Sequence, residues 1–144
     1  MKPFRILLST AFALTLGGCA STSTPVTDSH PVSPRHHYWE YSRYARRVPY
    51  DAKVVVVRDR NALGDPARAR VRVDTDSLAS LQAAESVTFY VAPGDHQLSV
   101  DPTFHIGPGP VEHTFHFAAN QTAYFRVVTS FDSFDIQPAT SGKP

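Results

Sequence analysis

Beyond Pro49 the chain is a series of short hydrophobic runs, some alternating with polar residues, separated by turn-forming residues. Ala52 to Arg58 contains consecutive valines at 54–57, a β-branched run that is too short for a helix and suits a strand covered on both faces. Arg68 to Val73 alternates strictly, which places its arginines on the outer face of a strand. Its inward residues are then Ala69, Val71 and Val73.

The same reasoning predicts further short strands in the rest of the chain. Ala92-Pro93-Gly94-Asp95 fits a type II turn between two paired strands, because proline presets φ at the second position and glycine accepts a positive φ at the third. About seven strands with no amphipathic helix among them indicate an all-β fold, a single antiparallel, immunoglobulin-like β-sandwich. The further strands are expected at Ser77–Leu81, Val87–Val91, His96–Val100, Val111–Ala118, Thr122–Thr129 and Phe131–Ile136.

Residues 1–19 carry the features of an export signal. Lys2 and Arg5 give a positive start, and Ile6 to Leu16 forms an apolar run of the length found in signal-peptide cores. This run is too short to cross a hydrocarbon layer of about 30 Å. The following Leu16-Gly17-Gly18-Cys19 resembles the bacterial lipobox, which implies that Cys19 is acylated on its sulfur and becomes the mature N-terminus. The alternative is that Cys19 is an ordinary small residue at a signal cleavage site.

The lipobox resemblance also implies a location. Ala20 stands where lipoproteins retained in the inner membrane carry aspartate, so the resemblance implies anchoring in the bacterial outer membrane, on its periplasmic face. Two or more acyl chains, such as palmitate, hold a protein stably on a membrane, whereas one chain gives marginal binding. The membrane is therefore an expected partner of the chain through Cys19.

The segment that follows Cys19 predicts a tether. Residues 20–37 are rich in serine, threonine and proline and have few apolar side chains, so they cannot repay the entropy lost on ordering. A flexible chain from Cys19 to Tyr50 would have a reach of roughly 30 Å. The expected organisation is a signal peptide at 1–18, a lipid-anchored tether at 19–50, a β-sandwich at 51–137 and a flexible tail at 138–144.

Aromatic residues and arginines interleave between residues 38 and 47. Such stretches anchor partners or lie at membrane interfaces, and the aromatic candidates for partner contact are Tyr38, Trp39, Tyr41 and Tyr44. The alternative is that this arm forms a helical turn that packs on one end of the domain.

Composition and charge exclude several classes of protein. The chain has 144 residues, 42% of them hydrophobic, which is enough for one globular domain. Its single cysteine excludes a disulfide framework and sites that need several thiolates. The net charge is +1, and it becomes −1 when residues 1–18 are removed, because this segment contains Lys2 and Arg5 and no acidic residue. We therefore expect no polycationic surface for binding nucleic acid. The chain has neither a Gly-x-Ser-x-Gly motif nor a phosphate-binding loop, so we expect no enzyme activity and no cofactor.

Two groups of residues are candidates for ligand binding. Arg68, Arg70 and Arg72 stand about 7 Å apart on one strand face and would repel one another unless acidic groups or an anionic ligand lay opposite. The alternative is that they keep the sheet soluble. A metal site would need to join His96, His105 and His113, whereas His96 alone fits an imidazole that bonds to loop carbonyls.

Several short motifs in the domain resemble an uncharacterised family of small bacterial lipoproteins. They are the valine-rich strand at 54–59, the turn around Gly64, and the segments 71–74, 91–96 and 122–126, and the match spans Ala52 to Thr129. The resemblance implies a transthyretin-like or PEGA-like β-sandwich, and it implies no catalytic residues. The chain departs from the family at Asp74-Thr75-Asp76, where the family carries Asp-Gly.

Two hypotheses for function follow. The first is a lipid-anchored, non-catalytic binding or adaptor domain for an envelope protein or polymer. The second is a periplasmic module that binds a small ligand or metal near His96, His105 and His113.

Overall fold

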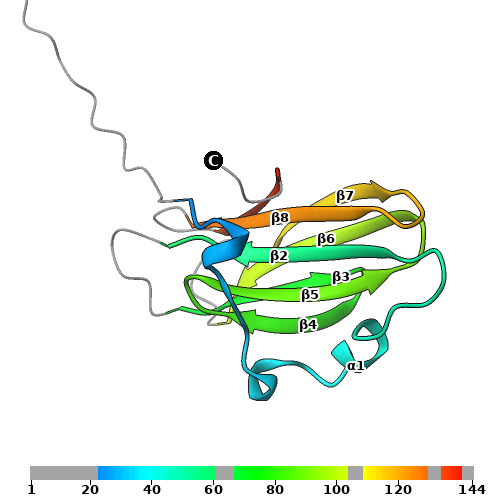
Figure 1. Ribbon diagram of the computed structural model, residues 1–144. Coiled ribbons are helices and arrows are strands. Elements are labelled where there is room, and N and C mark those ends of the chain that lie inside the picture. The colour runs from blue at the N-terminus through cyan, green and yellow to red at the C-terminus, as the bar shows by residue number, and fades with distance from the viewer. Residues whose placement is uncertain (1–22, 61–66, 104–108, 130–133, 141–144) are drawn as a thin grey trace, which may run out of the picture.

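A computed structural model of the chain describes residues 23–60, 67–103, 109–129 and 134–140, and it confirms the all-β fold (Figure 1). These residues form nine strands, one short helix and two short 3-10 helices. The strands are β1 (His30–Pro31), β2 (Ala52–Arg58), β3 (Ala69–Val73), β4 (Asp76–Leu81), β5 (Glu85–Val91), β6 (Gly94–Pro102), β7 (Val111–Phe117), β8 (Thr122–Thr129) and β9 (Phe134–Ala139). The helices are η1 (Val26–Asp28), η2 (Pro34–His36) and α1 (Tyr41–Tyr44).

The strands form two sheets that pack as a sandwich. The five-stranded sheet has the order β1-β5-β2-β8-β9, and the four-stranded sheet has the order β4-β3-β6-β7. Most neighbours are antiparallel, but β1 pairs with β5 and β2 pairs with β8 in parallel. The predicted antiparallel sandwich is therefore confirmed, with nine strands instead of about seven and with these two parallel pairings, in which strands distant in sequence lie side by side.

The burial predicted for β2, on both faces, and for the inward residues of β3 is confirmed. Val54 and Val56 of the central strand β2 are fully buried, and Val55 and Val57 on the opposite face are 6% and 1% exposed. This strand is thus covered on both faces, as its valine run predicts. The alternating residues of β3 that were expected to face inward, Ala69, Val71 and Val73, are all 0% exposed.

The expected hairpin between β5 and β6 is wrong. Gly94 has the predicted positive φ, 132°. However, β5 pairs with β2 and β6 pairs with β3, so the turn at residues 92–93 carries the chain from one sheet to the other. The alternating apolar residues of β5 and β6 face the core whether the two strands pair with each other or lie in opposite sheets. The sequence pattern therefore does not distinguish a hairpin from a crossing between sheets.

Several element boundaries also differ from the prediction by one to three residues. β6 continues to Pro102, and β9 runs from Phe134 to Ala139, so the sandwich extends two residues beyond the predicted end at 137. The predicted signal peptide and Cys19 lie outside the described residues.

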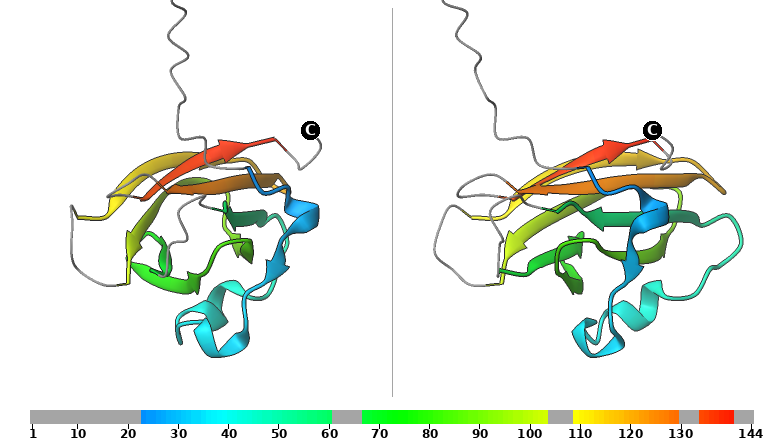
Figure 2. Two further views of the ribbon diagram at one scale, coloured as in Figure 1. Left: turned by 90° about the vertical axis from the view of Figure 1, so that its left-hand side faces the viewer. Right: turned by 60° about the vertical axis from the view of Figure 1, so that its left-hand side comes forward.

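The prediction of a disordered tether is wrong for the described part of the N-terminal segment. Residues 24–44, here called the strap, lie against the sandwich (Figure 2). Val32 is 4% exposed and belongs to the hydrophobic core, and its N–H donates to the carbonyl oxygen of Ser86 in β5 at 2.8 Å. The strap folds despite its polar composition because strands of the sandwich supply partners for its backbone and a site for its valine.

The strap closes one open side of the sandwich. Its β1 covers the edge of β5 in the larger sheet. Further along, His37 forms a bridge with Ala79, and the N–H of Tyr38 donates to the carbonyl oxygen of Leu78 at 3.0 Å, so the edge of β4 in the smaller sheet is also covered. The strap therefore joins the two sheets and removes two exposed strand edges.

We expect Val32→Ala to destabilise the protein by about 1–2 kcal/mol, because it removes buried methyl groups from the core. The matched control is Val48→Ala, since Val48 is 59% exposed, and surface changes of this kind stay within about 0.5 kcal/mol. Urea unfolding of both variants measures the difference. An equal, near-zero effect of the two substitutions would show that the strap does not pack on the sandwich.

Candidate functional site

One end of the sandwich holds the beginning of the strap. We call it the anchor end, defined by Thr24 and by Asp59, which follows β2. The N–H of Thr24 donates to Oδ1 of Asp59 at 2.9 Å, and Nε of Arg126 donates to Oδ2 of the same carboxylate at 2.8 Å. In return, Oγ1 of Thr24 accepts the N–H of Arg60 at 3.1 Å. Because the Asp59 side chain is only 1% exposed, these are charge-assisted bonds shielded from water.

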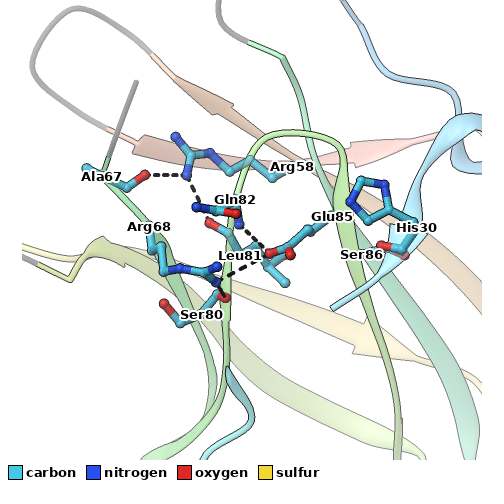
Figure 3. A network of polar contacts seen from close by, with 9 residues as sticks. All are labelled: His30, Arg58, Ala67, Arg68, Ser80, Leu81, Gln82, Glu85 and Ser86. Atoms are coloured by element: carbon cyan, nitrogen blue, oxygen red, sulfur yellow. Dashed lines mark hydrogen bonds and ion pairs between the residues drawn. The ribbon is translucent and has the colours of Figure 1, made fainter. Parts of the chain in front are cut away.

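A buried arginine organises the polar groups beside this end (Figure 3). Arg58 is 0% exposed, and its Nη1 donates to the carbonyl oxygen of Leu81 at 2.9 Å and to that of Ala67 at 2.5 Å. Its guanidinium lies 4.8 Å from the ring centroid of Phe134. Arg58 thus joins the end of β2 to the chain around β3 and β4, which makes its role structural.

The predicted arginine stripe is largely neutralised within the fold. Arg68 donates to the carbonyl oxygen of Ser80 at 2.6 Å and lies 3.4 Å from Oε2 of Glu85 (Figure 3). Arg70 forms a two-pronged ion pair with the buried Asp101, and hydrogen bonding to that carboxylate is the largest cause that raises the pKa of Arg70. Arg72 is half-buried and makes no ion pair within the described ranges. Acidic groups therefore lie opposite two of the three arginines and reduce their mutual repulsion. The stripe offers little free charge to an anionic ligand.

The opposite, distal end of the sandwich is where β2 begins. It holds the turn between β3 and β4 at 74–75 and the turn between β7 and β8 at 118–121. Nine residue steps along an extended chain separate Tyr50 from Asp59, so the two ends lie roughly 30 Å apart.

Two of the predicted partner-contact residues attach the arm to the sandwich instead. The hydroxyl of Tyr41 donates to the carbonyl oxygen of Thr88 in β5 at 2.9 Å, and that of Tyr44 donates to Oδ2 of Asp76 at 2.8 Å. Burial, followed by the bond to Asp76, raises the pKa of Tyr44 to about 12. The half-buried Tyr38 contributes to the raised pKa of Arg70 and so faces the sheet. The predicted alternative, a helical turn packed on the domain, therefore describes the arm.

Trp39 differs from these tyrosines because its side chain faces solvent. It is 73% exposed, and Val48 and Tyr50 are 59% and 67% exposed. The guanidinium of Arg43 lies over the indole, 5.0 Å from its ring centroid, and also pairs with Asp76 at 3.2 Å, which places Trp39 near the β3–β4 turn. We call Trp39, Val48 and Tyr50 the distal trio; they are the exposed large hydrophobic residues of the described chain.

The backbone around Tyr50 is held in an unfavourable conformation. Its φ is 74°, a value that bulky residues rarely adopt. The carbonyl oxygen of Tyr50 accepts the N–H of Asn120 at 3.0 Å, and Nη2 of Arg47 donates to Oδ1 of Asn120 at 2.8 Å. The β7–β8 turn thus fixes a strained residue whose ring points away from the core, an arrangement that often marks a functional surface.

The two described histidines of the candidate metal site, His96 and His113, each bond to a different aspartate. Nε2 of His96 lies 2.9 Å from the carbonyl oxygen of Ala92, which confirms its predicted bond to a loop carbonyl, and its Nδ1 lies 2.8 Å from Asp74. His113 instead bonds to Asp135 in β9 at 2.9 Å. His105 lies outside the described residues, and no group of three metal-binding side chains occurs within them.

The carboxylate that holds His113 is stabilised in its charged form. Although burial acts to raise the pKa of Asp135, hydrogen bonds from Gln137, His113 and the N–H of Ile136 outweigh it and lower that pKa. The His113–Asp135 pair joins β7 to β9 on the side of the sandwich opposite the strap, so it too has a structural role.

Described residues line at least two surface grooves. One, of about 450 Å³, lies beside the start of the strap and is lined by residues 23–26, Arg126 and Pro138. The other, of about 410 Å³, lies beside the β7–β8 turn and is lined by Phe115, Tyr124 and Pro138. No carboxylate among the described residues lines either groove, and His116 is the one imidazole among the lining residues of the second.

A comparison with models of protein families found no match, and neither did a search of curated proteins. Within the described ranges, the structure has no helix long and apolar enough to span a membrane.

We expect the stabilising effect of the Tyr44 hydroxyl to disappear at high pH. Because burial and the bond to Asp76 raise the pKa of Tyr44 to about 12 in the folded protein, and this pKa lies near 10 in an unfolded chain, the contribution of the protonated hydroxyl to stability is fully present below pH 10 and is lost as the pH rises to 12. Tyr44→Phe should therefore be less stable than wild type at pH 9, and the difference should shrink towards pH 12. Chemical unfolding across this range measures it, with the exposed Tyr50→Phe as control; a constant difference would contradict the proposed bond.

Proposed function

We propose that this protein is a lipid-anchored protein of the bacterial cell envelope whose β-sandwich acts as a non-catalytic binding or adaptor domain. The export signal and the lipobox-like Leu16-Gly17-Gly18-Cys19 support acylation of Cys19, and Ala20 supports an outer-membrane location on the periplasmic face. The motifs that resemble small bacterial lipoproteins point in the same direction. The proposed partner is an envelope protein or polymer.

The exposed distal trio is the observation that carries this proposal. Exposed aromatic residues supported by arginine are typical of residues that dominate binding energy at interfaces. The surrounding residues are fixed, since Tyr44 and Arg43 bond to Asp76 and Arg47 bonds to Asn120. A rigid support lowers the entropic cost of binding a partner.

Its position suits an adaptor. The trio lies at the end of the sandwich opposite Thr24, where the chain leads back towards Cys19. An anchored domain would thus hold the membrane at one end and present Trp39 and Tyr50 at the other. The arginine stripe and the histidines carry no comparable argument, because their described members bond within the fold or are half-buried.

The lipid anchor is tested by mass spectrometry of the full-length protein expressed in a diderm bacterium. We expect a mature chain that begins at Cys19 and carries acyl groups, partitioning into detergent. Cys19→Ser should remain unacylated and lose membrane attachment. A mature wild-type chain with an unmodified sulfur, or an intact residue 1, would contradict the anchor.

The binding face is tested by photo-crosslinking in intact cells. A photoreactive residue at position 39 should trap a specific envelope protein or polymer, because Trp39 is the most exposed member of the trio. The same residue at position 137, an exposed site on the edge strand β9, is the control. Equal products from both positions, or none from position 39 in the lipidated protein, would overturn the assignment of this face.

A further inference from the structure

The strap makes the connection between lipid and domain very short. Only residues 20–23 separate Cys19 from Thr24. Five residue steps of fully extended chain span at most about 17 Å. By contrast, a free segment from Cys19 to Tyr50 would reach roughly 30 Å on average and considerably more when extended.

The connection ends at Thr24, which is fixed to the sandwich. Its N–H bonds to the buried carboxylate of Asp59, which is held in turn by Arg126, and eight residues later Val32 lies in the core. Releasing Thr24 would leave Asp59 without one of its donors in a site that water barely reaches, a loss that costs more than breaking an exposed bond. The domain therefore cannot move away from the lipid without breaking buried contacts.

We infer that the bond between Thr24 and Asp59 holds the anchor end of the sandwich against the bilayer headgroups and points the distal trio away from the membrane. This inference rests on the proposed acylation of Cys19. It assigns the anchor end a partner, the lipid surface, and makes Asp59 a positioning residue that sets the orientation of the domain.

The surface at the anchor end fits headgroups and not the hydrocarbon layer. Exposed residues beside Thr24 include Thr27, Asp28 and Arg60, which are polar and carry both signs of charge. The exposed large hydrophobic residues of the described chain all lie at the distal end. The anchor end therefore contacts the membrane because the tether is short, and none of the large hydrophobic side chains that are exposed in the described chain lies there to insert.

Energy transfer to the membrane measures this orientation. Cys19 is the only cysteine of the chain, and its sulfur is blocked when acylated, so one introduced cysteine carries a donor dye without competition. Thr27→Cys labels the anchor end and Val48→Cys labels the distal end, both at exposed positions. Each lipidated protein is reconstituted into phosphatidylethanolamine–phosphatidylglycerol vesicles that contain an acceptor lipid.

We expect transfer from position 27 to exceed transfer from position 48 by at least about twofold, since the two ends differ by roughly 30 Å. Insertion of about twenty Gly/Ser residues after Ser21 is the matched control, because it lengthens the tether to a reach of about 25 Å without touching the fold, and it should remove most of the difference. Asp59→Asn should reduce the difference in part.

Equal transfer from both positions in the protein with the native tether would overturn the inference, as would a difference that survives the insertion unchanged. Either of these two results can be told apart from a failure of the proposed lipid anchor. A protein that is not acylated would not incorporate into vesicles at all, which refutes the lipid anchor itself.

Discussion

The structure depends on closing the open side of a two-sheet sandwich. The edges of β5 and β4 would present unpaired backbone groups on that side, and the strap supplies partners to both. Val32 adds an apolar side chain to the core from the same segment. Because the strap bonds to both sheets, its contacts hold the sheets in place relative to each other. The same contacts fix the course of the strap along the sandwich. The short distance between Cys19 and the domain follows from this closure.

Ion pairs with buried carboxylates fix the start of the strap to the larger sheet and join two strands of the smaller sheet. Asp59 receives the N–H of Thr24 and the guanidinium of Arg126, and Asp101 receives Arg70. Such pairs add little net stability compared with apolar packing, but removing one partner leaves a buried charge and is strongly destabilising. They therefore favour one arrangement of chain segments over others. The arginines that look like a ligand site in the sequence mostly perform this task.

Much of the sandwich is predictable from the sequence because the inward residues of a strand recur with period two. The valines of β2 and the alternating residues of β3 are buried as expected, and Gly94 has its positive φ. Strand pairing is less predictable, since β5 and β6 show the same alternation whether they pair with each other or lie in opposite sheets. Turn chemistry alone suggested a hairpin that does not form.

The strap and the candidate site could not be predicted fully from the sequence, for a different reason. Composition predicts disorder for residues 20–37, yet one valine and a few backbone bonds suffice once strand edges are available as partners. Those edges belong to residues forty or more positions away, so no local pattern reveals them. The arm was identified as a candidate from its aromatic residues, but only the three-dimensional structure separates Trp39, which faces solvent, from Tyr41 and Tyr44, which bond inward.

Amide hydrogen exchange within the strap tests this account most directly. The N–H groups of Val32 and Tyr38 bond to Ser86 and Leu78 on opposite sheets. We expect both amides to be protected to about the level of the β5 amides in the native protein, because opening them requires separating the strap from the sandwich. Exchange of these two amides at the rate of an unstructured peptide, while β5 stays protected, would contradict the account.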